Sequence, residues 1–128
     1  MQNKIKNYND AQLFVLSNSL MSTVYSKVVN MNKDDKNMIG YKLVEYINEF
    51  TLCFSHSYKS TELEEKFNYS TKAKYYVESF EIQLKIVENL KLLTPKQMVT
   101  LVKPFGELMK HFMSWHNSLK TKIEKSSK

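Results

Sequence analysis

The chain has 128 residues, of which 42% are hydrophobic and 25% are charged, with two glycines and two prolines. This length suits one domain with a buried core, and so few glycines and prolines exclude a turn-rich all-β fold. No apolar run approaches the roughly 20 residues that cross a bilayer, and the first ten residues lack the apolar region of a secretory signal. The single cysteine, Cys53, cannot form a disulfide within the chain, so we expect a cytoplasmic protein.

The net charge of +6 is unevenly distributed along the chain. Residues 1–90 contain 11 lysines and 11 acidic residues, whereas residues 91–128 contain 8 lysines against Glu107 and Glu124. There is no arginine, so recognition of phosphate must use lysine point charges rather than planar guanidinium forks. A local excess of positive charge favours polyanionic partners, with nucleic acid ahead of a membrane surface.

The first predicted helix spans about residues 10–30. A polar segment interrupts the apolar pattern after it, and Asn32 then suits the N-cap of a second helix. Asp34 and Asp35 fall in the first turn of that helix, where negative charge meets the positive helix end. The apolar stripe of the first helix, at spacings of three and four, comprises Leu13, Phe14, Leu20, Met21, Val24 and Val28.

The second helix is predicted over about residues 33–58 and the third over about residues 62–92. Thr61 and Glu64 form a capping-box pattern at the start of the third helix. The apolar stripe of the second helix comprises Ile39, Leu43, Tyr46, Ile47, Phe50, Cys53 and Phe54. The stripe of the third comprises Leu63, Phe67, Val77, Phe80, Leu84 and Val87.

The fourth helix, predicted over about residues 95–121, has the clearest start signal in the chain. Thr94 is a suitable cap, Pro95 takes the first helical position, and Gln97 follows three residues after the cap. Pro104 lies inside this helix, where it removes one backbone hydrogen bond and should bend the axis.

Four amphipathic segments joined by short links predict an all-α fold, an antiparallel up-down four-helix bundle. We expect one domain over residues 1–128, without internal repeats. Only the tail, residues 122–128, is predicted to be disordered.

The fourth helix should present two different faces. Lys96, Lys103 and Lys110 recur at intervals of seven, about 10.5 Å apart along a helix axis, and so cover roughly 21 Å. We call these three residues the lysine stripe. They fit a track for phosphates, a protein-docking face or the ordinary solvated face of a bundle helix. Thr100, Glu107, Ser114 and Asn117 share that face. The predicted core stripe comprises Met98, Leu101, Val102, Phe105, Leu108, Met109, Phe112 and Leu119.

The sequence gives little support to a metal site or an enzyme. A di-iron bundle needs glutamate three residues before histidine, and none of the three histidines has one. Glu107 with His111, and Cys53 with His56, each share a helix face, but two ligands on one helix do not make a site. We therefore expect surface histidines, a packed Cys53, no metal, no cofactor and no catalytic residues, because no glycine loop or nucleophile elbow is present either.

Some apolar residues fall outside the core stripes and could cover a subunit interface. Trp115 is ambiguous, because it lies close to the core stripe but near a helix end, where it could anchor such an interface. The other candidates are Tyr41, Val44, Tyr75, Tyr76 and Met113.

Several segments together resemble a known family. The strongest match is the run LTPKQ at residues 93–97, followed by ELMKHFMSW at residues 107–115 and by the basic Lys120 and Lys122. The segments 33–40 and 84–86 match less specifically, and the matches span about residues 22–122 in all. On these segments the chain resembles the accessory variability determinants (Avd proteins) of diversity-generating retroelements. They belong to a wider group of small bacterial four-helix bundles that includes the proteins of 23S rRNA intervening sequences.

The resemblance implies a protein without catalytic activity, assembled as a homopentameric barrel of four-helix bundles. It implies binding of RNA and DNA through a basic surface, and association with the reverse transcriptase of the same retroelement. That complex makes mutagenic cDNA from template-repeat RNA for retrohoming, without a membrane or a small-molecule substrate. Lys85 and Lys110 match positions where basic residues serve this association, whereas Glu81 stands where an arginine is often found.

The predicted binding residues are therefore Lys85, Lys96, Lys103, Lys110, Lys120 and Lys122. Two other functions remain open from the sequence. One is a ribosomal-RNA-associated bundle of the intervening-sequence type, and the other is a purely structural oligomerisation bundle whose lysines only confer solubility.

Overall fold

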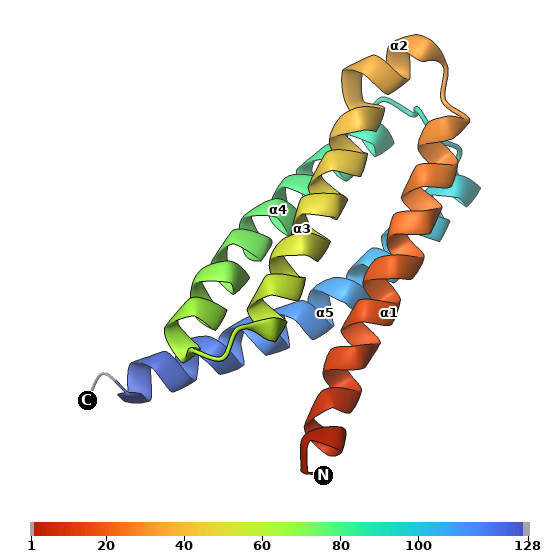
Figure 1. Cartoon of the computed structure of the whole chain (residues 1–128). Helices are drawn as coiled ribbons and strands as arrows, with labels where there is room; N and C mark the ends of the chain where they lie inside the picture. The colour runs from red at the N-terminus through yellow and green to blue at the C-terminus, as the bar shows by residue number, and fades with distance from the viewer. Residues whose placement is uncertain (1, 127–128) are drawn as a thin grey trace.

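The computed structural model describes the backbone of residues 2–126 and the side chains of residues 11–126. Over this range the chain is helical, with no β-strand. Four long helices alternate in direction and form the predicted up-down bundle (Figure 1). They are α1 (Gln2–Val29), α3 (Tyr41–Lys59), α4 (Leu63–Asn89) and α5 (Pro95–Ser126). The short α2 (Lys33–Asp35) and the π-helical turn η1 (Lys36–Gly40) lead into α3.

The long helices follow one another around the core in chain order. The antiparallel pair α3 and α4 packs along its whole length, and α5 lies between α4 and α1 (Figure 1). α1 closes the ring by packing on α3. Every long helix therefore buries an apolar face against two neighbours, which is the arrangement that short connections favour.

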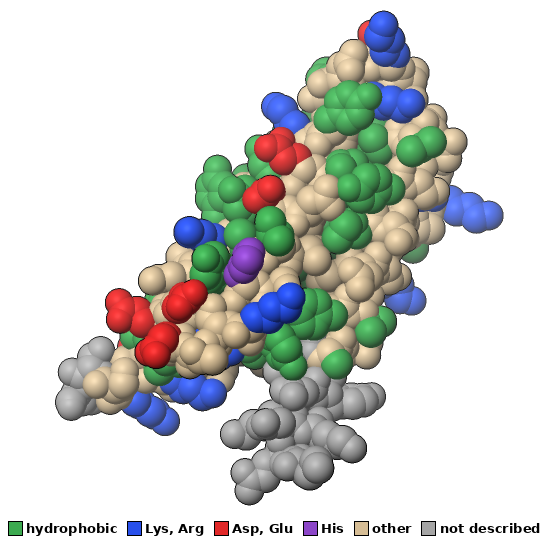
Figure 2. Space-filling view, viewed as in Figure 1, with side chains coloured by type: hydrophobic (Ala, Val, Ile, Leu, Met, Phe, Trp, Pro, Cys, Tyr) green, Lys and Arg blue, Asp and Glu red, His purple; other side chains and the backbone are tan. Residues whose placement is uncertain are grey.

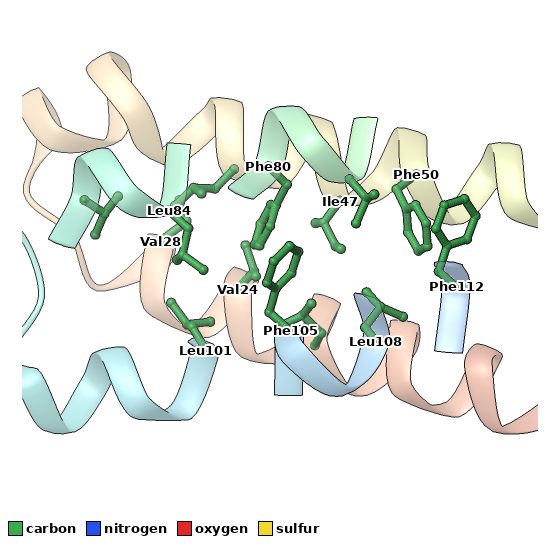
Figure 3. Close-up of a cluster of buried hydrophobic side chains, with 14 of the residues drawn as sticks. Val24, Val28, Ile47, Phe50, Phe80, Leu84, Leu101, Phe105, Leu108 and Phe112 are labelled. Atoms are coloured by element: carbon green, nitrogen blue, oxygen red, sulfur yellow. The ribbon is translucent and has the colours of Figure 1, made fainter. Parts of the chain in front are cut away.

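The core takes side chains from all four long helices. Figure 3 shows Val24 and Val28 of α1 beside Phe80 and Leu84 of α4. Leu101 of α5 lies at the same end of the core. Phe105 meets Phe80 with ring centroids 5.3 Å apart, near the middle of the bundle.

An aromatic cluster fills the end of the core near the α3–α4 turn. Phe112 of α5 meets Phe50 of α3 edge-on, with centroids 5.1 Å apart. Phe54 contacts Phe14 of α1 at 4.8 Å and Trp115 of α5 at 5.5 Å. Tilted and edge-to-face pairs at these distances are the favoured aromatic geometries. Specific ring contacts, in addition to burial, therefore hold α1, α3 and α5 together here.

Two predicted helix starts are confirmed in atomic detail. The Asn32 side chain accepts the backbone N–H of Asp35 at 2.8 Å. At the start of α5, the Thr94 N–H donates to the Gln97 side chain at 2.9 Å, and the Gln97 N–H donates to Thr94 Oγ1 at 3.1 Å. This reciprocal pair satisfies backbone donors that a helix end leaves open.

The capping box predicted for Thr61 and Glu64 is wrong. α4 begins at Leu63, and its N-cap is Glu62, which makes no side-chain cap bond. Tertiary contacts hold this helix start instead. Ser57 Oγ donates to the Lys66 carbonyl at 2.6 Å, and Lys66 Nζ donates to the Tyr58 carbonyl at 2.9 Å.

Three predicted helix boundaries also change. α1 already begins at Gln2 rather than near residue 10, and α4 ends at Asn89 rather than near residue 92, because Lys91 adopts the left-handed φ of 55°. The disorder predicted for residues 122–128 is wrong for residues 122–126, which continue α5. The half-buried Ile123, four residues after the buried Leu119, extends the apolar face. Residues 127–128 lie outside the described part of the chain.

The two glycines occupy opposite environments. Gly40 is buried in the π-helical turn, where an added Cβ would stand 3.0 Å from Val28 Cγ1 and 3.2 Å from Met31 Sδ. Gly106 is exposed inside α5, where an added Cβ would meet nothing within 4 Å. The absence of a side chain at Gly40 lets α1 approach the start of α3 closely.

This contrast predicts opposite effects of the same substitution. Gly106→Ala should raise the free energy of unfolding by about 0.5–1 kcal/mol, because alanine loses less backbone entropy in a helix. Gly40→Ala should lower it by roughly 1 kcal/mol, because Val28 is a stiff β-branched residue that must move. Urea denaturation of both variants measures the difference, and equal stabilisation would contradict the close packing at Gly40.

Candidate nucleic-acid interface

The lysine stripe lies on the outer face of α5. Lys96, Lys103 and Lys110 are all exposed, and a seven-residue interval turns an α-helix by only about 20° from register. The three ammonium groups therefore follow one line along the helix. Within the residues whose side chains are described, none of the three forms an ion pair. The polar residues predicted for the same face are exposed as well: Thr100, Glu107, Ser114 and Asn117.

The other predicted basic residues do not continue this line. Lys120 and Lys122 are exposed near the end of α5, but a two-residue interval separates them by roughly 200° around the axis. They consequently lie on opposite flanks of the stripe. The uncharged Thr121 takes the position between them.

Lys85 is exposed on α4, and the contacts between α4 and α5 show where it stands. Ser70 meets His116, and Phe80 meets Phe105. In this antiparallel register Lys85 is level with about residue 100 of α5. It is offset from Lys110 by roughly 14 Å along the axes, so the two lysines are not adjacent and Lys85 stands nearer the level of Lys103.

Val102 was predicted to lie in the core, and this is wrong, because its side chain is 44% exposed. Leu101 and Phe105 point inward, and Val102 is turned about 100° from Leu101 onto the flank of the helix. Val99 is 60% exposed on the same flank. Two β-branched apolar residues therefore stand in solvent beside the lysine stripe.

His116 was predicted to be a surface residue, and this is also wrong. It is 5% exposed, and its Nδ1 lies 2.7 Å from Ser70 Oγ in a buried hydrogen bond. The ring stacks near Phe67 and Phe112 at centroid distances of 5.3 and 6.0 Å. Its spacing, four residues after Phe112 and three before Leu119, was the signal for a core position.

Burial is the main cause that lowers the pKa of His116, and the nearby charges of Lys74 and Lys120 lower it further, against an opposing effect of Glu78. The neutral ring is thus the form that fits the core. Ser70 is fully buried, so no substrate can reach this serine–histidine pair from solvent. The pair is a polar link between α4 and α5.

The structure brings no third ligand to the pairs Glu107 with His111 and Cys53 with His56 within the described part of the chain. Cys53 is buried as predicted, and burial, with a smaller effect of the Glu49 charge, raises the pKa of its thiol against an opposing effect of Lys72. His56 instead stacks on Tyr69 at 5.0 Å. Among the described residues, no three His, Cys, Asp or Glu side chains gather where they could hold a metal ion.

Trp115 packs within its own bundle. It is half-buried against Phe54 and Tyr58, and its indole N–H donates to Ser57 Oγ at 3.3 Å. Lys66 Nζ stands 5.6 Å from the centre of the indole ring, within reach of a cation–π attraction. The tryptophan therefore ties α5 to the α3–α4 turn.

The other interface candidates divide into two groups. Tyr41 and Tyr75 are exposed, with more than half of each side chain in solvent. The remaining three are half-buried against their own core: Val44, Tyr76 and Met113. Figure 2 shows further apolar side chains scattered over the face made by α1 and α3, so apolar exposure is not confined to one helix.

No protein-family model matches the chain, and no curated protein matches it. Across residues 2–126, no helix combines the length and the apolar character needed to span a bilayer.

The burial of His116 predicts a pH-dependent stability. The unfolded chain binds this proton more strongly, with a pKa of about 6.5, than the folded protein does. The contribution of neutral His116 to the free energy of unfolding should therefore be complete above about pH 6.5. It should be lost as the pH falls toward the lower pKa of the folded state. His116→Asn should flatten the dependence of the free energy of unfolding on pH in that window. His111→Asn, on the half-exposed flank of α5, is the control, and a slope unchanged by His116→Asn would contradict the assignment.

Proposed function

We propose that the protein is a non-catalytic accessory protein of the Avd type. In this function it binds RNA and DNA through the basic surface of α5 and associates with the reverse transcriptase of a diversity-generating retroelement. The complex then makes mutagenic cDNA from template-repeat RNA for retrohoming.

The observation that carries the proposal is the concentration of positive charge in the last part of the chain, with three of its lysines in line on the outer face of α5. The whole net charge of +6 arises in residues 91–128, and the lysine stripe stands exposed, without ion pairs in the described part of the chain. Solvent-exposed lysines without an acidic partner can bind phosphates. The accompanying release of counterions is the main source of affinity for nucleic acid without sequence preference.

Assembly would strengthen such binding. A single stripe offers three point charges, and a ring of identical subunits multiplies weak contacts through avidity. We propose a closed homo-oligomer, a pentamer, as the working form. Tyr41 and Tyr75 support this part of the proposal, because exposed tyrosines are typical of subunit contacts.

The first test concerns nucleic acid. Changing Lys96, Lys103 and Lys110 together to Gln should weaken binding to RNA and DNA and reduce the slope of log affinity against log salt by roughly 2–3 per bundle engaged. Fluorescence anisotropy with a labelled single strand over a range of salt concentrations measures this slope.

A matched variant keeps the total charge change equal. Lys33, Lys42 and Lys59 are also exposed but lie on α2 and α3, and their triple change to Gln should reduce the slope far less. If the slope of log affinity against log salt were equal in the two triple variants, the lysine stripe would be an ordinary solvated face. Binding would then depend only on the general charge of the protein.

The second test concerns the polymerase. Lys85→Glu with Lys110→Glu should abolish co-purification with the retroelement's reverse transcriptase, because charge reversal disrupts the electrostatic complementarity that sets encounter and register. Both positions are exposed, so the melting transition should change little.

Two controls accompany this test. Circular dichroism must show an unchanged helical content, and light scattering of the wild-type protein should give a mass near five times the 15.1 kDa of one chain. Recovery of the complex at the wild-type level would exclude Lys85 and Lys110 from the contact. A particle of one chain at micromolar concentration would exclude the ring.

A further inference from the structure

A groove opens at the end of the bundle where α4 turns into α5. Its cavity volume is about 790 Å³, within the range of sites that take large apolar groups. Leu93 and Met98 form its buried floor, and Val99 and Val102 stand along its side. Leu90, 54% exposed on the same turn, adds a further apolar side chain to this end of the bundle.

The walls of this groove are fixed in place by the backbone. At the end of α4, the N–H groups of Lys91 and Leu92 donate to the carbonyls of Glu88 and Val87, both at 3.1 Å. With Lys91 in the left-handed conformation, this is a Schellman motif that closes the helix. The capping pair of Thr94 and Gln97 holds the other side. A groove built between two satisfied helix ends does not need to be ordered when a ligand binds.

The rim of the groove is mainly positive. Lys91 and Lys103 line it, against the one carboxylate of Glu88. Neither lysine forms an ion pair or a hydrogen bond through its side chain within the described part of the chain. The adjoining Lys85 and Lys96 are exposed and add positive charge near the same end of the bundle.

We infer that this groove docks an acidic amphipathic segment of a partner protein, with large apolar side chains on the groove floor and carboxylates on Lys91 and Lys103. Phosphates alone would leave Val99 and Val102 in water, and an apolar segment without carboxylates would leave the lysine rim unpaired. A helix with leucines at spacings of three and four and glutamates on its flanks satisfies both features.

This inference rests on the proposed function for the identity of the partner, which would then be a segment of the polymerase. The groove would be a contact with the polymerase that is separate from Lys85 and Lys110, because neither of these lysines lines it. Lys103 belongs to both the stripe and the groove, so nucleic acid and the docked segment meet at this residue.

The test uses the full chain and a synthetic helix-forming peptide with leucines at i, i+3, i+4 and i+7 and glutamates elsewhere, labelled for fluorescence anisotropy. The peptide should bind the wild-type protein and should bind the double variant Val99→Ser with Val102→Ser about tenfold more weakly, because two apolar contacts are lost. Lys91→Gln should weaken binding as well. Val15→Ser is the matched control, since Val15 on α1 is 58% exposed, much like Val99.

The outcomes separate the two proposals. Nucleic-acid affinity should be unchanged in Val99→Ser with Val102→Ser, whereas Lys96→Gln with Lys110→Gln should weaken nucleic acid and leave the peptide bound. A wild-type protein that bound the peptide but not nucleic acid would therefore count against the stripe and not against the groove. Equal binding of a version with lysines in place of glutamates, or binding unaffected by the double variant, would overturn the inference. The inference would also be overturned if the wild-type protein did not bind the peptide and the particle mass of the double variant were lower than that of the wild type. The groove would then be a contact with a second copy of the chain.

Discussion

The edge-on packing of Phe112 against Phe50 and Phe54 is the contact on which the rest of the structure depends, because it holds α5 on the bundle. The three other long helices lie in a part of the chain with no net charge, whereas residues 91–128 carry all of it. Lysines along one face repel one another, and that repulsion acts only over short distances at physiological salt. The burial of three large apolar side chains outweighs this repulsion, because truncating any one of them to alanine would cost several kcal/mol. They are Phe105, Leu108 and Phe112. The exposed charge is thus tolerated because the opposite face of the same helix is so apolar.

Polar contacts then fix which part of α5 meets which neighbour. Apolar packing alone allows a helix to slide by a turn with little loss, but a buried hydrogen bond that must be made allows one register. Ser70 with His116, and Ser57 with Trp115, provide two such bonds toward the same end of α5. The register they impose places Lys85 level with about residue 100 rather than with Lys110. The level of Lys85 relative to the lysines of α5 therefore depends on a register that two buried serines help to fix.

Most of the fold could be predicted from the period of apolar residues and from side-chain caps. Asn32 and the pair Thr94 and Gln97 have local signals, and the structure makes those bonds. Thr61 has the same kind of signal, but the bonds between Ser57 and Lys66 outcompete it, and no local pattern reveals a contact nine residues away.

The candidate site was predicted only in part. The exposure of the lysine stripe follows from helical spacing, since residues seven apart share a face. His116 and Val102 were misjudged for one reason: residue type was given more weight than angular position. A histidine opposite the stripe is buried because Ser70 satisfies its ring nitrogen, and a valine on the flank is exposed because no neighbouring helix covers it. The groove escaped prediction because it is formed by a turn whose shape depends on the left-handed φ of Lys91, which the sequence does not specify for a lysine.

Under the two proposals, the proximity of stripe and groove would give α5 two kinds of affinity with different dependence on salt. Contacts of Lys96 and Lys110 with phosphates would weaken steeply as salt rises, because they would derive from counterion release. Contacts made on Leu93, Met98, Val99 and Val102 bury apolar area, which salt does not screen. Lys103 belongs to the stripe and also lines the groove, so its charge could pair with a phosphate or with a carboxylate, but not fully with both. A docked acidic segment and nucleic acid would consequently compete for this lysine at low salt, while the apolar floor keeps the protein partner bound when the phosphate contacts have weakened. The order in which partners leave α5 would then be set by ionic strength, with nucleic acid released first.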